Sequence, residues 1–377
     1  MPKVLLGDVA TERKETYKGS KAGYPIVGLE HLIPEKITLT AWSEDSENTF
    51  SKMFHKGDIL FGRRRAYLKK AAVAPFDGIC SGDITVIQAN PEKIIPELLP
   101  FIIQNDTLFD FAVGKSAGSL SPRVKWQHLK NYEFELPNMD KQRELAELLW
   151  AMDATKKSYQ ELITATDELV KSQFIVEFGL PDENDHGYEI GSIGDVVCDV
   201  HYGTSKKASE DGEYTYLRMN NITYDGVLDL SDTKKISLPD KELTGCIVKK
   251  GDVLFNRTNS RDLVGKTCVF NQEEPMIIAG YIIRLRMNGR VLPEYLSTFL
   301  NLKSSKKMLM EMAKGAVGQA NINAQEVQSI AMIIPPMEIQ LPFAKLIKQS
   351  DKSKFELEQA LSELTATYKS IIAENLG

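Results

Sequence analysis

The sequence contains no apolar run that approaches the ~20 residues of a membrane-spanning helix. Only a few apolar residues precede Asp8, so the N-terminus does not resemble a signal peptide, and we expect a cytoplasmic protein. The four cysteines form no Cys-x-x-Cys pair, and the five histidines are equally dispersed. This spacing argues against a metal site, and we expect reduced thiols at Cys80, Cys198, Cys246 and Cys268.

The sequence also lacks the motifs of common catalytic sites. It has no G-x-G-x-x-G after a strand, no H-E-x-x-H and no G-x-S-x-G. The segment VGKT at 264–267 resembles the end of a phosphate-binding loop, but Ser260 stands where the first glycine of that motif belongs. IPPM at 334–337 lacks the leading polar residue and the aromatic residue of the DNA amino-methyltransferase signature. We therefore expect a binding protein and not an enzyme.

Length and charge set two further limits. At 377 residues the chain is too long for one ordinary domain, and ~150 residues per domain suggests two or three. The formal net charge of −6, taken alone, argues against a nucleic-acid partner. A nucleic-acid interface would therefore need a local concentration of basic residues.

What the chain does contain is an internal repeat. Four phrases occur in both halves: LLGDV at 5–9 and SIGDV at 192–196, KGDILFGRRR at 56–65 and KGDVLFNRTN at 250–259, PELLPFIIQ at 96–104 and PEYLSTFLN at 293–301, FELPNMDKQREL at 134–145 and MIIPPMEIQLPF at 332–343. The phrases keep their order, with offsets that drift only from 187 to 198 residues. We therefore predict a duplicated unit.

Each repeat is predicted to begin with a globular domain, at 1–137 and 188–335. These parts are rich in turn residues and in short β-type runs such as GDILF and DITVIQ. A few helices are expected among the strands, for example around 97–113 and 294–313. Both domains should therefore be mixed, with strands in the majority.

Each domain is followed by a long predicted helix. No proline or glycine occurs from Met139 to Phe178, nor after Pro342 until Gly377. The predicted helical segments are 138–180 and 336–377. Forty helical residues span about 60 Å, so two such helices would hold the domains well apart.

Apolar residues in both helices step by alternating three and four positions, as in a coiled-coil seam. The predicted seam residues are Leu145, Leu148, Met152, Thr155, Tyr159, Leu162, Thr166 and Leu169 in the first helix, and Phe343, Leu346, Ser350, Ser353, Leu357, Ala360, Leu364 and Thr367 in the second. Two amphipathic helices packed only on their own domains would show a similar stripe. We favour an antiparallel pair, because each helix follows its own domain and the chain has to return.

Positive charge is concentrated in the repeated segments. Residues 56–70 contain six basic residues and one acidic residue, and residues 249–266 contain five basic and two acidic residues. The helix at 140–178 contains eight acidic and five basic residues. A solvated basic surface would explain either segment alone, but recurrence at the same place favours contact with a phosphate backbone.

The repeated phrase divides into a shared part and a variable part. Gly57-Asp58 and Gly251-Asp252 are interpreted as tight turns ahead of buried strands, and hence as structural. After the strands the copies differ: GRRR at 62–65 against NRTN at 256–259, and likewise SPRVKW at 121–126 against QANINA at 319–324. Arginine can pair bidentately with guanine, and asparagine with adenine. Two domains with the same strand framework but different residues after the strand could therefore read two different DNA sequences.

Two variable globular domains, each with a GDILF or GDVLF strand and a following long helix, resemble the DNA specificity subunits of type I restriction-modification systems. HYGTSKK and YLRMNNI within 201–222, GQANINAQEV at 318–327 and IPPMEIQ at 334–340 support the resemblance, which covers the whole chain. The first repeat departs from the pattern, because it has no counterpart of GTS and has SLSPRVKW in place of the Gln-x-Asn-Ile form.

The resemblance implies an α+β fold with two similar, strand-rich target recognition domains, separated by two long antiparallel helices that form a coiled coil, with pseudo-twofold symmetry from the internal duplication. Each domain would read one half of a bipartite site in double-stranded DNA. The helices would set the spacer and dock two methyltransferase subunits, and motor-nuclease subunits would complete the enzyme. The chain itself would be non-catalytic, with no cofactor and no membrane partner. S-adenosylmethionine, ATP and magnesium are implied for the partner subunits.

The candidate DNA-binding residues follow from the basic segments and from the family-like phrases. They are Arg63, Arg64, Arg65, Lys69, Lys70, Arg123 and Lys125 in the first repeat, and Tyr202, Thr204, Ser205, Lys206, Arg218, Asn220, Asn221, Arg257, Asn259, Arg261, Lys266, Gln319 and Asn321 in the second. Two other functions stay open. One is a scaffold whose helices and repeats bind only proteins. The other is a single-chain modification or restriction enzyme, which the missing motifs disfavour.

Overall fold

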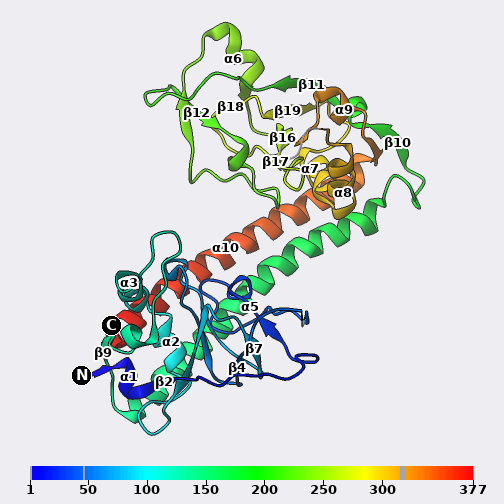
Figure 1. Cartoon of the computed structure of the whole chain (residues 1–377). Helices are drawn as coiled ribbons and strands as arrows, with labels where there is room; N and C mark the ends of the chain where they lie inside the picture. Colours follow the sequence, from blue (N-terminus) through cyan, green and yellow to red (C-terminus); the bar gives the residue numbers. More distant parts are fainter. Residues whose placement is uncertain (1, 46, 315–319, 377) are drawn as a thin grey trace. The chain divides into compact units, whose positions relative to one another are not determined.

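The computed structural model describes all residues except 1, 46, 315–319 and 377. The chain divides into two compact units: unit 1 is Met1–Glu161 with Leu357–Gly377, and unit 2 is Leu162–Glu356. The division falls within two long helices, α5 (Met139–Phe178) and α10 (Met337–Leu376). Each unit therefore contains one globular domain and a part of each long helix (Figure 1).

The globular domain of unit 1 consists of short strands and short helices. Its strands are β1 (Lys3–Leu5), β2 (Ala10–Glu12), β3 (Ile26–Val27), β4 (Lys52–Phe54), β5 (Ile59–Gly62), β6 (Ala71–Val73), β7 (Gly78–Cys80), β8 (Ile84–Ala89) and β9 (Glu133–Glu135). Its helices are α1 (Leu6–Val9), α2 (Leu99–Ile103), α3 (Asp106–Gly114) and α4 (Trp126–Leu129), with 3-10 turns η1 (Leu29–His31) and η2 (Ala66–Leu68).

The globular domain of unit 2 repeats this order with additions. Its strands are β10 (Glu189–Ser192), β11 (Val197–Tyr202), β12 (Tyr214–Leu217), β13 (Lys234–Ile236), β14 (Ile247–Val248), β15 (Val253–Asn256), β16 (Thr258–Asn259), β17 (Thr267–Val269), β18 (Met276–Ile278), β19 (Ile282–Met287), β20 (Ala320–Asn321) and β21 (Ala331–Ile334). Its helices are α6 (Asp240–Cys246), α7 (Pro293–Asn301), α8 (Lys303–Met312) and α9 (Ala324–Gln328), with 3-10 turns η3 (Ile193–Val196) and η4 (Met219–Asn221).

The sheets of the two domains have the same topology. The antiparallel order β2-β8-β5-β6 in unit 1 corresponds to β11-β19-β15-β17 in unit 2. A second sheet, β3-β7-β4, corresponds to β12-β18-β14, and in both the first pair is parallel and the second antiparallel. Strand β13 extends this second sheet in unit 2, whereas the same edge in the described part of unit 1 has the isolated bridge Ile26–Ser43. The predicted mixed fold and its duplication are therefore confirmed.

Both Gly-Asp turns lie directly before the strand that carries the repeated phrase, β5 or β15. Gly57 has φ of 91° and Gly251 has φ of 90°, in the left-handed region that side chains with a Cβ rarely adopt. Asp58 accepts hydrogen bonds from the His55 amide, and its carboxylate is buried. The structural interpretation of these turns is confirmed.

The buried carboxylates are neutralised by arginines that come from different segments of the two domains. Arg13, directly after β2, donates to Asp58 through Nε at 2.6 Å and Nη2 at 3.1 Å. Arg286 of β19 donates to Asp252 through Nε at 2.7 Å and Nη2 at 2.8 Å. A buried carboxylate needs such a partner because an unpaired charge in the interior is costly. Both units therefore need an arginine beside the buried aspartate, but the arginine comes from a different position of the domain in each unit.

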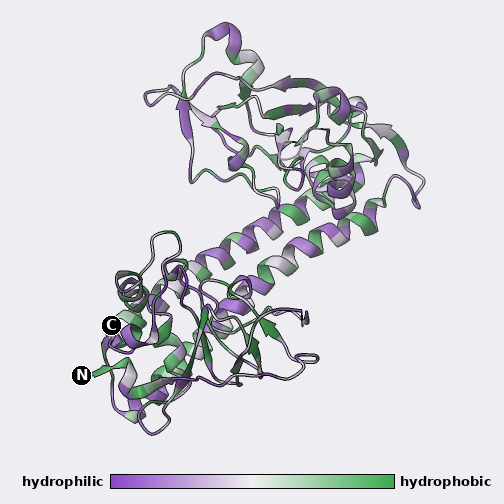
Figure 2. Ribbon diagram, viewed as in Figure 1, coloured by the Kyte–Doolittle hydropathy of each residue, from purple (hydrophilic) through white to green (hydrophobic). Residues whose placement is uncertain are grey.

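In each unit, α5 packs against α10 as well as against the domain. In unit 1 the Lys156 ammonium lies 4.6 Å from the Tyr368 ring centroid. In unit 2 Lys354 lies 2.6 Å from Asp167, and Phe174 packs edge-on against Phe343. Partner numbers fall along α10 as they rise along α5, so the helices are antiparallel. Hydrophobic and hydrophilic residues alternate along both (Figure 2), and no described helix is long and apolar enough to cross a membrane.

The predicted seam is correct at most positions and wrong by one residue at the others. The wrongly predicted seam positions are exposed to solvent: Leu148, Thr155, Leu162 and Leu169 in α5, and Ser353 and Thr367 in α10. The covered face instead contains Leu149, Ile163 and Val170 of α5, together with Lys354 and Tyr368 of α10. A helical period of 3.6 residues is compatible with either of two neighbouring apolar stripes. The leucines on the exposed side of α5 made the wrong stripe look like the seam. A lysine can lie on this face because the Lys354 ammonium pairs with the Asp167 carboxylate of α5.

A buried glutamine fixes the start of each long helix. Gln142 Nε2 donates to the Pro137 carbonyl and Oε1 accepts from the Ile95 amide, both at 2.9 Å. Gln340 Nε2 donates in the same way to the Pro335 carbonyl at 2.7 Å, and its Oε1 accepts from the Leu292 amide at 2.8 Å. The Gln therefore ties each long helix to the segment that enters the helices of its own domain.

Replacement of Gln340 by leucine should lower the free energy of unfolding of unit 2 by about 1–3 kcal/mol, because buried backbone groups lose their partners. Urea unfolding of the full chain measures the change. Gln349→Leu is the matched control, since Gln349 is exposed on the same helix in the same unit. Equal stability of the two variants would contradict the role assigned to Gln340.

Candidate nucleic-acid interface

The two variable segments of each repeat lie side by side in the structure. In unit 1 the backbones of Arg64 and Arg123 form an antiparallel bridge, and the Arg65 amide donates to the Pro122 carbonyl. In unit 2 strand β16 pairs with β20, and Thr258 stands opposite Asn321. The sequence separates these segments by about 60 residues in each repeat, so their contact could not be read from it. We call the paired segments the tip of each unit: 63–65 with 121–124, and 257–259 with 320–322.

One arginine occupies the same place in both tips. The Arg63 amide donates to the Asp83 carbonyl, and its own carbonyl accepts from the Val124 amide. Arg257 repeats this arrangement with the Tyr281 carbonyl and the Ile322 amide. In both arginines the Nε atom is buried without a hydrogen-bond partner among the described residues. The tips therefore share one arginine, and they differ only at the positions that follow it.

In unit 1 the differing positions form a charged cluster around Asp83. Arg123 donates to this carboxylate through Nε at 2.7 Å and Nη2 at 3.3 Å, and Arg64 Nη1 lies 3.4 Å from it. Arg64 Nε donates to the Ser121 hydroxyl. The hydrogen bond from Arg123 lowers the pKa of the Asp83 carboxyl below its usual value, and the charge of Arg64 acts in the same direction.

Asp83 was not among the residues singled out in the sequence. It precedes β8 in the strand phrase DITVIQ, and an acid was not expected beside a basic tip. The matching position in unit 2 is Tyr281, which precedes β19 and is half exposed. The strand repeat alone would have aligned these two positions and revealed that they differ.

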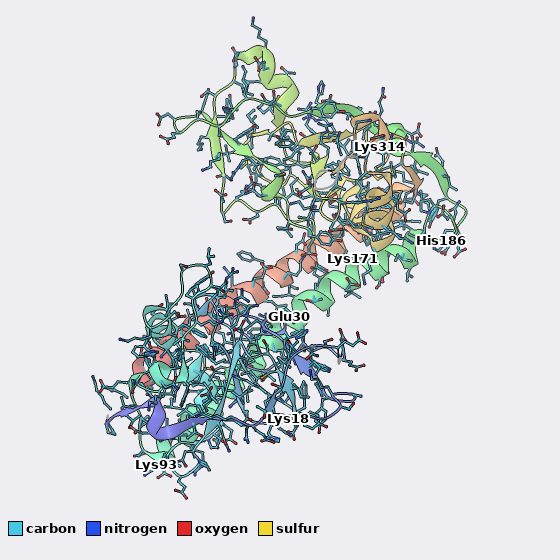
Figure 3. All side chains as sticks on the ribbon, in the orientation of Figure 1. Lys18, Glu30, Lys93, Lys171, His186 and Lys314 are labelled. Carbon is cyan, nitrogen blue, oxygen red and sulfur yellow. The ribbon has the colours of Figure 1, made fainter. Side chains whose placement is uncertain are left out.

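In unit 2 the differing positions are polar and uncharged. The Thr258 hydroxyl donates to Asn321 Oδ1 at 3.1 Å, and Asn259 Nδ2 donates to Asn256 Oδ1 at 2.9 Å. Lys314, labelled in Figure 3, forms an antiparallel bridge with Asn321. Its ammonium lies 2.7 Å from Glu326 of α9. Gln319, also predicted to bind DNA, lies outside the described residues.

Arg65, Lys69 and Lys70 of unit 1 lie around the turn η2. Arg65 and Lys69 flank this turn, with positive φ of 54° and 50°, which is uncommon for residues other than glycine. The Arg65 side chain is exposed, and Lys69 pairs with Asp106. Lys70 donates to the Leu29 carbonyl at 2.7 Å. Lys125, just before α4, is exposed.

A hairpin loop projects beside this cluster. The Ala117 and Arg123 backbones exchange both hydrogen bonds, which closes the loop 118–122. Gly118 has φ of 116°, and Leu120 in this loop is 91% exposed. An apolar side chain held outside the protein next to two arginines adds a hydrophobic group to the tip of unit 1.

In unit 2 several candidates are exposed but already make contacts within the chain. The Tyr202 hydroxyl accepts from the Ala324 amide at 2.8 Å, and the Arg257 guanidinium lies 4.8 Å from the Tyr202 ring centroid. Lys206 pairs with Glu242 at 2.8 Å, and Ser205 beside it is exposed. Arg261 Nε donates to the Met310 carbonyl at 3.3 Å, and its side chain is exposed.

Arg218 and Asn220 meet at one carboxylate. Arg218 Nη2 lies 2.9 Å from Asp232, and Asn220 Nδ2 donates to the same group at 3.4 Å. Arg218 is half-buried, whereas Asn220 is exposed. These two residues belong to the segment around η4, which is joined to the neighbouring loop through Asp232.

Three further candidates are buried. Lys266 Nζ donates to the Met219 carbonyl at 2.7 Å, and burial lowers the pKa of this lysine. Asn221 donates to the carbonyls of Asp229 and Asp232, and Thr204 accepts from the Lys206 amide. These side chains support neighbouring loops from inside and present little surface to a ligand.

Comparison with known proteins identifies the family of the chain. Residues 4–165 and 186–365 match the family described as type I restriction modification DNA specificity domain. The EcoKI type I specificity subunit of Escherichia coli strain K12 is 25% identical over 187 residues, which cover 48% of this chain and 40% of that protein. The putative MjaX specificity subunit of Methanocaldococcus jannaschii is 24% identical over 168 residues, which cover 44% and 39%.

The chain thus spans about two fifths of the length of these relatives. Among solved structures, the S subunit of a type I restriction-modification system from M. genitalium has a TM-score of 0.58 at 12% identity, over 98% of this chain and 94% of that one. This likeness concerns the fold. Because the family matches both repeats over most of their length, the chain belongs to the type I restriction-modification DNA specificity domain family.

Proposed function

We propose that this chain is a sequence-specific DNA-binding subunit of a type I restriction-modification enzyme, in which each globular domain reads one half of a bipartite target. The observation that carries this proposal is the pair of tips. One backbone scaffold presents Arg64, Asp83 and Arg123 in unit 1, whereas in unit 2 it presents uncharged side chains at the same positions. Two half-sites of different sequence require such a difference.

In this proposal the residues shared by the two tips and the residues that differ between them contact different parts of the DNA. Arg63 and Arg257 are the same in both tips, so they suit contacts with phosphates, which are the same in every sequence. The residues that differ suit contacts with base edges in a groove, where hydrogen-bonding patterns distinguish the bases. The exposed Lys125 and Arg261, which follow the tip segments closely in sequence, add positive charge beside the tips. Local positive charge on the domains can attract DNA although the chain as a whole is negative.

The long helices offer a surface for protein partners. On α5 in unit 2, Leu162, Leu169 and Val176 follow one another at intervals of seven residues and are 51%, 56% and 67% exposed. A row of exposed apolar side chains on one helix face is typical of a protein-binding surface. We assign it to a methyltransferase subunit, with two such subunits in the complete enzyme and motor-nuclease subunits completing it. In this proposal the chain itself is not catalytic, and S-adenosylmethionine, ATP and magnesium belong to those partners.

Replacement of the exposed Lys125 by alanine should weaken DNA binding and make its dependence on salt less steep. If the ammonium contacts a phosphate, the slope of log K against log salt should fall by about one. Lys93→Ala is the matched control, because Lys93 (labelled in Figure 3) is an exposed lysine of the same unit and lies between β8 and α2, outside the tip segments. The measurement is a titration of the full chain with duplex DNA at several salt concentrations. Binding that does not depend on salt would favour the protein-only scaffold instead.

Exchange of residues 1–137 for the first domain of another specificity subunit should change one half of the methylated sequence and leave the other half intact. The two tips lie in separate units, each with its own core, so each should read its half-site independently. Single-molecule sequencing of modified bases in cells that contain the complete system gives the result. A change in both halves would show that the domains do not read separate half-sites.

Insertion of seven residues after Glu161 in α5 and seven after Glu356 in α10 should lengthen the spacer by about three base pairs. Seven helical residues add about 10 Å, and one base pair of DNA occupies about 3.4 Å. Seven residues also keep each packed face nearly in phase. The methylated sequence again provides the measurement. A spacer of unchanged length would rule out the helices as its determinant.

A further inference from the structure

We propose that Asp83 is a positioning residue that holds Arg64 and Arg123 as a guanine-reading pair, so that the half-site read by unit 1 contains guanine at the contacted position. This inference rests on the proposed function and specifies it for one tip. The three side chains come from three separate segments, which the fold brings to one point at the end of β5.

The carboxylate is the centre of the cluster and is more covered than its partners. The Asp83 side chain is 21% exposed, whereas those of Arg64 and Arg123 are 39% and 41% exposed. The two arginine side chains are therefore more exposed to solvent than the carboxylate that they contact. The Asp83 amide donates to the Ser81 hydroxyl at 3.2 Å, and its carbonyl accepts from the Arg63 amide at 3.0 Å. Both the backbone and the side chain of Asp83 are thus fixed to the tip.

Each arginine keeps donors that could reach a base. Among the described residues, Arg123 Nη1 and Arg64 Nη2 make no hydrogen bond within the chain, while the other nitrogens hold Asp83 or Ser121. Guanine presents two acceptors, N7 and O6, at its major-groove edge, whereas adenine presents one acceptor and one donor. The free nitrogens of the two arginines are hydrogen-bond donors only, so they match the two acceptors of guanine and not the acceptor and donor of adenine. Because the planar guanidinium groups are already held in place, less conformational freedom is lost on binding.

General attraction to DNA does not explain an acid in this position. A carboxylate beside the phosphate backbone reduces the positive potential of the tip and costs affinity for every sequence. We infer that the carboxylate instead serves to orient the two guanidinium groups. Unit 2 has neither the acid nor the arginine pair: Thr258, Tyr281 and Asn321 occupy the corresponding positions. The guanine requirement is therefore expected for unit 1 alone.

The test begins with the methylated sequence of the complete wild-type system, with the half-site of unit 1 assigned by domain exchange. Duplexes with this sequence are then prepared with either guanine or 7-deazaguanine, which lacks the N7 acceptor, in that half-site. Wild-type chain should bind the 7-deazaguanine duplex about tenfold more weakly. Asp83→Asn should bind the guanine duplex about tenfold more weakly and should distinguish the two duplexes much less.

Asp77→Asn is the matched control, because it removes one exposed carboxylate from the same domain away from the tip. It should keep the full discrimination. Ser121→Ala is a second variant, which releases only Arg64 Nε and should reduce discrimination partially even if Asp83→Asn folds poorly. A loss of stability without altered base recognition would weaken binding to both duplexes equally, so the ratio of the two affinities isolates the positioning role.

Three outcomes would overturn the inference: a unit 1 half-site without guanine, equal wild-type affinity for both duplexes, or unchanged discrimination in Asp83→Asn. In each of these cases a bipartite methylated sequence would still support the proposed function. A wild-type system with no bipartite sequence, or a chain that does not bind duplex DNA, would instead refute the proposed function itself.

Discussion

The frame of each domain depends on a buried carboxylate at the start of its central strand. Asp58 and Asp252 accept hydrogen bonds from the turn that precedes the strand and from an arginine on a neighbouring segment. A buried charge has to be compensated fully, so it fixes the turn, the strand and the arginine relative to one another. The strand then runs only four residues, from Ile59 to Gly62 in unit 1, before the tip begins. The position of the tip is therefore set by an interaction in the interior.

This arrangement separates what must stay constant from what can vary. The duplicated domains keep the carboxylate, the left-handed glycine and the first arginine of the tip, although Arg13 and Arg286, which pair with the carboxylate, come from different segments. Beyond that arginine the backbone hydrogen bonds are retained while the side chains change. A tip whose backbone is held by the frame can change its side chains without loss of the fold. Such independence is what a protein needs if it reads different DNA sequences with one architecture.

The fold was largely predictable because it depends on local signals. Strand phrases and the absence of proline and glycine reflect backbone constraints that act over a few residues. Together with the repeat, they predicted the mixed domains, the duplication and the two long helices. The phase of the helix seam was predicted wrongly at Leu148, Leu162 and Leu169, because the neighbouring phase is nearly as apolar and the choice is made by contacts far along the chain. For the same reason Asp83 was missed. Asp83 contacts two arginines that lie 19 and 40 residues away in the sequence, and the intervening sequence does not indicate these contacts.

The division of the chain within its long helices has a consequence for synthesis on the ribosome. The core of unit 1 is closed by Tyr368, Ile372 and Leu376 of α10, and Asn105 donates to the Leu376 carbonyl. The domain that is translated first therefore lacks part of its own core until α10 has emerged. Unit 2, by contrast, is continuous in sequence and can be completed earlier. The nascent first domain has to remain soluble while incomplete, and the finished fold is closed by a segment made more than two hundred residues later.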